Sequence, residues 1–349
     1  MHFHSLLILL YASITTVVAN SVTCPAFNWR SFPAICRGPP EVYTVEESPG
    51  KGLGVFAAHD LQVGDIVMQE TPVIQIEPPK VKKGSPYPMS MVSSLVLEQF
   101  NALTIEQQKD VLSLTLQIRK ADEVSVDRVG AIFKNNAYNT GDHISLFPKI
   151  ARINHSCRPN LSYYWNASRN RKIVYATRPI KKGEEVFVSY ISLLLAQEDR
   201  QRYLDRYGFK CHCEACAQER VAMQLSDQRR TTISKAFTDF APELVLTPPK
   251  SKAALQQARN NAKASIQLAE LVQEEGLADY YAKAYRIVAI SHARIGEWQP
   301  AAVWANKGYE LKVREDPKSA LTMEMHHLTS NFIANWESEL KNQSQGHEN

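Results

Sequence analysis

Apolar and polar residues alternate in several short runs between residues 41 and 190, a pattern typical of half-buried β-strands. The runs lie at 41–46, 55–58, 65–70, 73–77, 161–165, 172–177 and 186–190. Proline and glycine residues form turn signals between them, as at 48–52. The polar stretch 166–171 separates two runs and predicts an antiparallel strand pair. This region therefore predicts a domain built mainly of short strands.

Other regions show the spacing of apolar residues that is typical of helices. The region from about 88–134 interrupts the strands as a helical insert, and a shorter helix is predicted at 193–206. Residues 253–336 are rich in Ala, Leu, Glu and Gln and predict an α-helical C-terminal module. Within it, 282–305 resembles one tetratricopeptide helix pair. The whole pattern predicts an α+β chain with a hinge near 247–250.

The composition is ordinary for a globular protein, and 349 residues are enough for one large and one smaller domain. Lys and Arg number 40 against 36 Asp and Glu, which gives a net charge of +4. So small an excess does not call for nucleic acid or an anionic membrane as a partner. We therefore expect no direct binding of nucleic acid.

The N-terminus carries an apolar run at 6–19 that is too short to cross a bilayer comfortably. Its end, 17–19, matches the small-residue cleavage pattern of a secretory signal, although no Lys or Arg precedes the run. Residues 1–19 therefore predict a signal peptide, a location in the secretory pathway or outside the cell, and no membrane span after signal removal. Cys24 and Cys36 would then be an even pair that can form a small disulfide loop.

The other cysteines form a split set. Cys211, Cys213 and Cys216 lie close together, whereas Cys157 lies far upstream. A tetrahedral zinc site takes four thiolate or imidazole ligands, so Cys157 would complete it and the metal would join two distant segments. His212, inside the cluster, is an alternative ligand. In an oxidising lumen the thiols would instead pair as disulfides.

Four segments, in this order, resemble a SET domain followed by its post-SET zinc motif. They are KGLGVFA (51–57), NHSCRPN (154–160), GEEVFVSY (183–190) and YGFKCHCEAC (207–216). The most similar subgroup is the SET and MYND domain proteins and their relatives that lack the MYND finger. In the MYND-bearing members a cysteine-rich zinc finger lies near the insert, but the insert of this chain contains no cysteine, so no MYND finger is present. The resemblance implies the mostly-β SET fold, a β-clip with a pseudoknot in which the segment around Asn154 threads beneath a later connection.

The resemblance also implies a division of the chain. The expected parts are an N-terminal segment 20–40, a SET domain 41–192 containing the insert, a post-SET zinc motif 193–217, and the C-terminal helical module 218–349.

A pocket for S-adenosylmethionine and a channel for a target lysine follow from the same resemblance. The residues implied to contact the donor are Lys51, Gly52, Leu53, Gly54, Asn136, Asn154, His155, Tyr190 and Phe209. Asn135 is an alternative to Asn136. Tyr190 is the implied catalytic residue, Tyr207 is implied to line the lysine channel, and zinc is implied to be held by Cys157, Cys211, Cys213 and Cys216.

Methyl transfer from a sulfonium to an amine is an in-line displacement, so the lone pair of the amine must be close and aligned. The lysine must first lose its proton, and a neighbouring sulfonium and a dry channel both lower its pKa from about 10.4. Tyr190 would orient the neutral amine rather than act as a full base. The expected function is S-adenosylmethionine-dependent, zinc-containing protein-lysine methyl transfer, with a histone or another protein as substrate.

Two alternatives stay open. The signal-like N-terminus and the helical tail favour a non-catalytic binding module, because the methyl donor is scarce in some compartments. Glycosylation sequons begin at Asn154, Asn160 and Asn166, and a glycan on Asn154 would occupy the proposed site. Together with the donor pool that the family implies, this favours the nucleus or cytoplasm as the alternative location.

Overall fold

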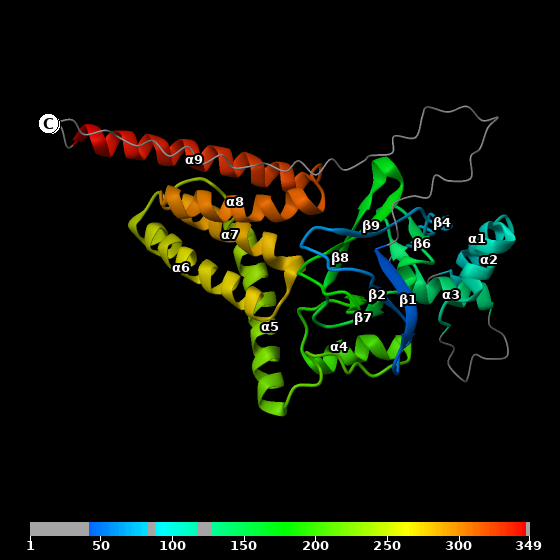
Figure 1. Cartoon of the computed structure of the whole chain (residues 1–349). Helices are drawn as coiled ribbons and strands as arrows, with labels where there is room; N and C mark the ends of the chain where they lie inside the picture. The colour runs from blue at the N-terminus through cyan, green and yellow to red at the C-terminus, as the bar shows by residue number, and fades with distance from the viewer. Residues whose placement is uncertain (1–41, 83–87, 117–126, 347–349) are drawn as a thin grey trace, which may run out of the picture. The chain divides into compact units, whose positions relative to one another are not determined.

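The computed structural model describes residues 42–82, 88–116 and 127–346 (Figure 1). The predicted signal peptide 1–19, the segment 20–40 and the cysteine pair Cys24 and Cys36 lie outside the described residues. From Val42 onward the described chain forms one compact unit.

The strands of the described chain form three small sheets. The first has the order β1 (Tyr43–Ser48), β2 (Gly52–Ala57), β10 (Glu185–Val188) and β7 (Asn154–His155). The second has the order β3 (Ile66–Glu70), β9 (Arg171–Ala176) and β8 (Leu161–Asn166), and the third β4 (Ile74–Ile76), β6 (Ile144–Leu146) and β5 (Tyr138–Asn139). The predicted pair of strands is confirmed, because β8 and β9 pair antiparallel along their whole length.

Apolar residues at alternate positions of the strands point to one side of the first two sheets and form a core there. In β10, Val186 and Val188 are fully buried, while the residues between and before them are partly exposed. They pack with Val55 of β2 and Val174 of β9 in one apolar cluster. In β10 the polar and apolar pattern of the sequence thus assigns the inner and outer faces correctly.

The two-residue strand β7 brings a distant segment into the first sheet. Asn154 and His155 pair in parallel with Phe187 and Val188 of β10. Asn160 locks the following loop to β10, because its Oδ1 accepts the Phe187 N–H at 2.7 Å and its Nδ2 donates to the Glu185 carbonyl at 3.0 Å. These bonds hold the 154–160 segment against the end of β10.

The helical insert is present as predicted. It consists of α1 (Met89–Asn101), α2 (Ile105–Leu112) and α3 (Arg128–Asn136). A capping box at Thr104 starts α2, and Asp127 caps α3. The apolar faces of the helices pack on β4 and β6. As a result, the C-terminal end of α3 leads directly into β5.

The C-terminal half is helical, which confirms the predicted α+β class. Its helices are α4 (Gln197–Leu204), α5 (Arg220–Phe240), α6 (Lys252–Glu274), α7 (Tyr281–Ala293), α8 (Trp298–Glu315) and α9 (Ala320–Gly346). Figure 1 shows α7, α8 and α9 stacked side by side. Buried alanines such as Ala289, Ala301 and Ala305 allow the close approach of these helices.

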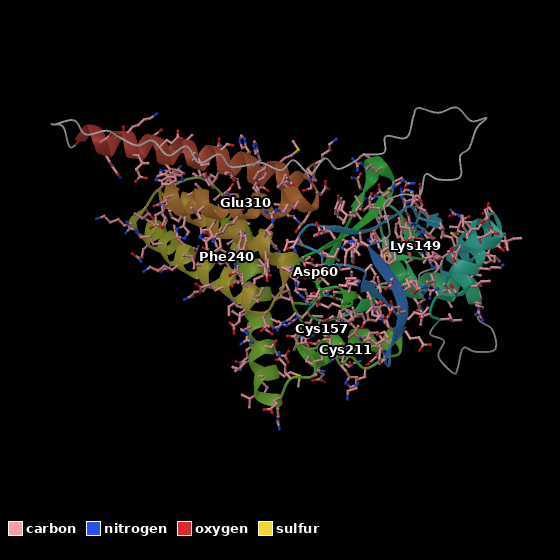
Figure 2. The ribbon with its side chains drawn as sticks, viewed as in Figure 1. Asp60, Lys149, Cys157, Cys211, Phe240 and Glu310 are labelled. Carbon is pink, nitrogen blue, oxygen red and sulfur yellow. The ribbon has the colours of Figure 1, made fainter. Side chains whose placement is uncertain are left out.

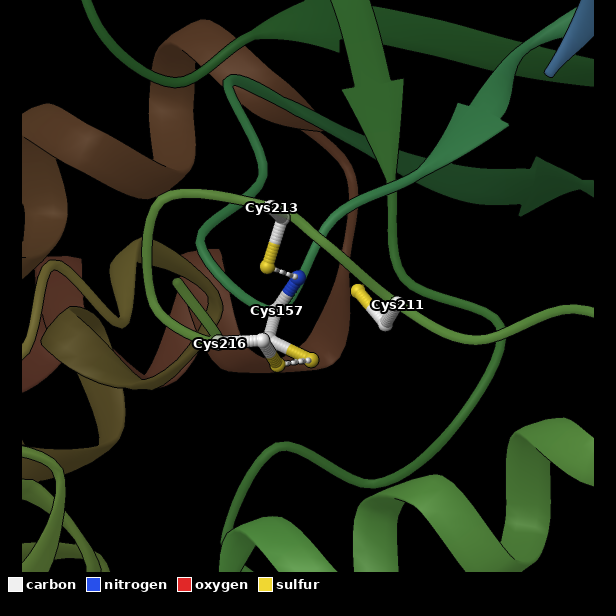
Figure 3. Close-up of side chains that lie close together, drawn as sticks. All are labelled: Cys157, Cys211, Cys213 and Cys216. Carbon is white, nitrogen blue, oxygen red and sulfur yellow. Dashed lines mark hydrogen bonds between the residues drawn. The ribbon is translucent and has the colours of Figure 1, made fainter. Parts of the chain in front are cut away.

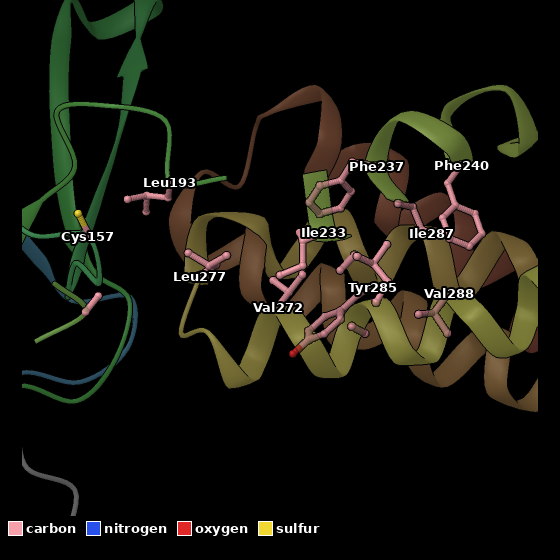
Figure 4. Close-up of a cluster of buried hydrophobic side chains, with 14 of the residues drawn as sticks. Cys157, Leu193, Ile233, Phe237, Phe240, Val272, Leu277, Tyr285, Ile287 and Val288 are labelled. Atoms are coloured by element: carbon pink, nitrogen blue, oxygen red, sulfur yellow. The ribbon is translucent and has the colours of Figure 1, made fainter. Parts of the chain in front are cut away.

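One apolar core joins the cysteine segments to the helical module (Figure 4), and Figure 2 labels Cys157, Cys211 and Phe240 of this core. Cys157 and Leu193 share this core with Ile233 of α5 and Val272 of α6. The helices on either side of the predicted hinge at 247–250 therefore contribute to the same core.

A buried ionic network reinforces this contact. Arg230 of α5 is fully buried and donates to Glu275 at 2.9 Å, to the Leu193 carbonyl at 2.9 Å and to the Cys157 carbonyl at 3.1 Å. Glu275 also accepts from Ser226 and Arg229. The network ties α5 and the residue after α6 to the loop that carries Cys157.

Candidate functional site

A cavity of about 410 Å³ lies where the β1–β2 hairpin, the end of the insert and the approach to the cysteine cluster meet. Its volume is in the range of small-molecule sites, about 300–1,000 Å³. The predicted site residues that line it are Lys51, Leu53, Asn136, Asn154, Tyr190, Tyr207 and Phe209. Segments that are more than 150 residues apart in sequence, such as those of Lys51 and Phe209, thus meet at one cavity.

Gly52 and Gly54 do not line this cavity, in contrast to the prediction. Gly52 has a φ of +78°, so it serves the hairpin turn. A Cβ at Gly54 would lie 2.5 Å from a carboxylate oxygen of Glu185 and 3.1 Å from the Asn154 amide nitrogen. The absence of a side chain at Gly54 therefore makes room for the polar network beside the cavity.

That network is centred on Glu185, which the sequence analysis did not single out. Its carboxylate accepts hydrogen bonds from Lys51 at 2.6 Å, from Ser48 at 2.9 Å and from Asn154 at 2.9 Å. Asn154 gives its other amide hydrogen to the Leu53 carbonyl at 3.0 Å. A ligand at this wall would therefore meet the Asn154 Oδ1, with the Lys51 ammonium close by.

His155 lies behind the cavity wall rather than on it, which also differs from the prediction. Burial lowers its pKa to about 4, so the ring is neutral. Its Nδ1 is 3.1 Å from the Tyr190 amide and must accept that N–H, which leaves the proton on Nε2, 3.3 Å from the Cys157 sulfur. His155 thus connects the Tyr190 backbone to the cysteine cluster.

Three aromatic rings stand together on the wall. The Tyr190 and Tyr207 ring centroids are 5.1 Å apart, and Phe209 meets Tyr190 edge-on at 6.5 Å. The Tyr190 hydroxyl donates to the Ile153 carbonyl at 2.7 Å. Burial raises the Tyr190 pKa, so the phenol keeps its proton at neutral pH. Its oxygen is consequently an acceptor for a polar group in the cavity, not a base.

Asn136 is fixed at the end of α3. Its Nδ2 donates to the Ile132 carbonyl at 2.8 Å and to the Thr115 carbonyl at 2.9 Å. Asn135 lines the same cavity, so both of the alternative asparagines lie at the site.

Tyr138 and Tyr163 also line the cavity, and the sequence analysis did not propose them. Their rings meet edge-on, with centroids 5.4 Å apart. The position of Tyr138, two residues after Asn136, was a usable signal. Tyr163 gave none, because an aromatic residue on a strand is usually part of the core.

The four predicted zinc ligands come together beside this wall (Figure 3). The sulfurs of Cys157, Cys211, Cys213 and Cys216 all lie within 4.8 Å of one another. Those of Cys157 and Cys216 are 3.6 Å apart, near the separation of about 3.8 Å that tetrahedral zinc imposes with bonds of about 2.3 Å. All four are free cysteines, and His212 is outside the cluster.

The charges around the sulfurs fit a metal centre. Hydrogen bonding from Cys157 lowers the pKa values of Cys213 and Cys216, the latter to about 7, which favours the thiolate form that metals bind. Hydrogen bonding among the four sulfurs raises the pKa values of Cys157 and Cys211. The buried Arg200 has an Nε and an Nη2 without a hydrogen-bond partner among the described residues. Burial lowers its pKa, but the sulfurs of Cys157 and Cys216 outweigh this effect and raise it. Arg200 would balance the negative charge of a zinc ion with four thiolates.

Comparison with known proteins agrees with this arrangement. The SET domain family model matches residues 52–191. Residues 52–191 therefore form a SET domain, and this region contains Asn154, Cys157 and Tyr190.

The relatives extend the likeness. The chain is 28% identical over 272 residues to "Histone-lysine N-methyltransferase set5" of Schizosaccharomyces pombe, a match that covers 77% of each chain. It is 45% identical over 73 residues to "N-lysine methyltransferase SMYD2" and 38% identical over 74 residues to "Histone-lysine N-methyltransferase SMYD3", both of Homo sapiens. The two human matches cover 21% of this chain and only 16% and 17% of those proteins. Separately, no helix in the described part of the chain is long and apolar enough to cross a membrane.

Proposed function

We propose that this protein transfers a methyl group from S-adenosylmethionine to a lysine side chain of another protein. The observation that carries the proposal is the single cavity at which Asn154, Tyr190, Tyr207 and Phe209 meet beside the four sulfurs. The relatives are named as lysine methyltransferases, which supports the same reaction. A histone or another lysine-bearing protein is the proposed substrate.

The wall of the cavity fits the charges of the methyl donor. The donor's amino-acid end is zwitterionic, and the Asn154 Oδ1 and the Lys51 ammonium offer an acceptor and a cation at one place. Phe209 and the neighbouring tyrosines supply apolar ring surface. When bound, the donor provides an electrophilic methyl group on a positively charged sulfur.

Tyr190 would hold the target amine. Its hydroxyl already donates a hydrogen bond to the Ile153 carbonyl, so its oxygen is left to accept an N–H of the amine. An amine held in this way can turn its lone pair toward the methyl group. Since the phenol stays protonated, the amine would lose its own proton to water, helped by the positive charge of the donor's sulfonium, which disfavours a second cation beside it.

The proposed zinc has a structural role. Cys157, Cys211, Cys213 and Cys216 would hold it, and it would fix Tyr207 and Phe209, which precede Cys211, against the cavity. No step of the transfer requires the metal to touch a reacting atom.

The test is transfer of a labelled methyl group to a mixture of lysine-bearing proteins by the full chain. We expect Tyr190→Phe to lower the rate by about 100-fold or more while it still binds the donor. Tyr203→Phe is the matched control, because Tyr203 is half exposed on α4 and away from the cavity. Donor binding without transfer by the wild-type chain would instead support the non-catalytic binding module.

A further inference from the structure

Lys172 is buried in a place where charged residues are rare. It lies on β9 with only 1% of its surface exposed. A lysine is almost never so buried unless it has a compensating partner. On β3, the residue opposite Lys172 is Glu70. The oxygens of Glu70, however, accept the backbone N–H groups of Lys149 and Ile150, at 3.0 and 2.9 Å.

Aromatic rings surround the Lys172 ammonium instead. Its Nζ lies 3.8 Å from the ring centroid of Tyr163, 4.3 Å from that of Tyr138 and 5.8 Å from that of Phe147. Tyr138 and Tyr163 are nearly perpendicular, at 82°, so the ammonium sits in the corner between two ring faces. Such a corner attracts a cation through the negative faces of the rings.

The same two tyrosines line the cavity with Tyr190 and Tyr207. Lys172 itself does not line it. Any change in the Tyr138 and Tyr163 rings alters the space around the aromatic wall, and Lys172 is the charged group that holds both of them.

We propose that Lys172 is a positioning residue that holds Tyr138 and Tyr163 in place and thereby limits how many methyl groups the target amine can accept. This inference rests on the proposed function. Without the ammonium, the two rings would lose a shared contact and gain rotational freedom. The space for a methylated amine would become larger and less defined.

Three variants distinguish the effect of the Lys172 charge from the effect of its side-chain volume. Lys172→Met removes the charge and keeps most of the length, and such a replacement of a buried charge is compatible with folding. Lys172→Arg keeps a cation that stacks well on tyrosine rings. Lys182→Met is the control, because Lys182 is exposed in a turn far from the cavity wall.

The first readout is the ratio of mono-, di- and trimethylated lysine produced by each variant, measured by mass spectrometry at a pH below the Lys172 pKa of about 7, where the ammonium is present. We expect Lys172→Met to raise the share of the more methylated products by at least about threefold. Lys172→Arg and Lys182→Met should keep the wild-type ratio. An unchanged ratio in Lys172→Met, or an equal change in Lys172→Arg, would overturn the inference.

The second readout needs no activity. In wild-type protein with labelled lysine and tyrosine, the Lys172 side-chain NMR signals should show ring-current shifts, and the Tyr138 and Tyr163 ring signals should change in Lys172→Met. Unshifted Lys172 signals in the wild type would reject the positioning role even if a variant fails to fold, and unchanged ring signals in a folded Lys172→Met would reject it as well. No transfer by the wild-type chain would contradict the proposed function, and the ring signals would still decide the role of Lys172.

Discussion

Tyr190 is held at three points that have different physical origins. Its hydroxyl donates to the Ile153 carbonyl, its ring packs on Tyr207, and its backbone amide donates to the His155 ring. His155 in turn faces the Cys157 sulfur. The position of the proposed catalytic oxygen is therefore coupled to the geometry of the cysteine cluster.

The burial of Lys172 predicts a pH dependence of stability. Burial lowers its pKa from 10.5 to about 7, and the faces of Tyr138 and Tyr163 act against this shift. Between pH 7 and 10.5 the unfolded chain binds the proton and the folded chain does not, so this contribution to stability increases with pH. Below pH 7 both states bind it, and the full cost of burying the charge remains.

Urea unfolding of wild type and Lys172→Met across pH 6 to 10 measures this contribution. The free energy of unfolding of the wild type should increase relative to the variant by up to about 5 kcal/mol as pH increases through this window. Tyr138 and Tyr163 have raised pKa values and Glu70 is held by backbone N–H groups, so none of them should reproduce the trend. A difference that stays constant with pH would contradict the burial argument.

The role of a single residue could be predicted where the short segment around it resembles a known motif. Asn154, Tyr190 and Tyr207 lie in segments that resemble a family, and the structure places all three at the cavity. Glu185 lies in such a segment too, but its role depends on Lys51, 134 residues away. The burial of Lys172 among aromatic rings could not be predicted from the sequence, because only the packed structure shows which rings enclose it.

At the scale of elements, most strands and helices were predictable, but the short strands β5, β6 and β7 and the joint packing of the elements were not. Alternation identified the β8–β9 pair, and helical spacing identified the insert. The core shared by Cys157 and α5 is a contact between distant segments, which local periodicity does not encode. The predicted boundary at 217–218 accordingly falls between two segments that share one core.

The buried network at this contact gives a second prediction. Arg230→Met would leave Glu275 without its fully buried partner and remove the bond to the Cys157 carbonyl. We expect the free energy of unfolding to decrease by about 3 kcal/mol, measured by chemical denaturation.

Lys235→Met is the matched control for Arg230→Met, because Lys235 lies on the same helix and forms an exposed pair with Asp239. Such surface pairs contribute about 0–1 kcal/mol. Equal destabilisation by the two substitutions would show that the buried network does not stabilise the joint core.

At the scale of the whole molecule, the secretory location remains a prediction from residues 1–19, and the structure limits which sequons can carry a glycan in the folded protein. Both amide hydrogens of Asn154 are used in hydrogen bonds, and Asn160 is fully buried with its Nδ2 donating to Glu184 and Glu185. A glycan on either nitrogen would remove one of these hydrogens, and on Asn160 it would also require space that folding does not leave.

We therefore expect folded protein from native cells to carry no glycan on Asn154 or Asn160, whichever compartment it occupies. Peptide mapping by mass spectrometry checks this and also shows whether residues 1–19 are removed. A glycan on either asparagine in folded protein would contradict the described geometry.

The account depends most on the metal that would join Cys157 to the 211–216 segment. The most direct measurement is the zinc content of the purified full chain, made on the same preparation that is assayed for methyl transfer. We predict one zinc per chain, loss of donor binding and transfer when a chelator removes it, and recovery when zinc is restored. Full transfer by metal-free protein, or cysteines joined in disulfides, would contradict it.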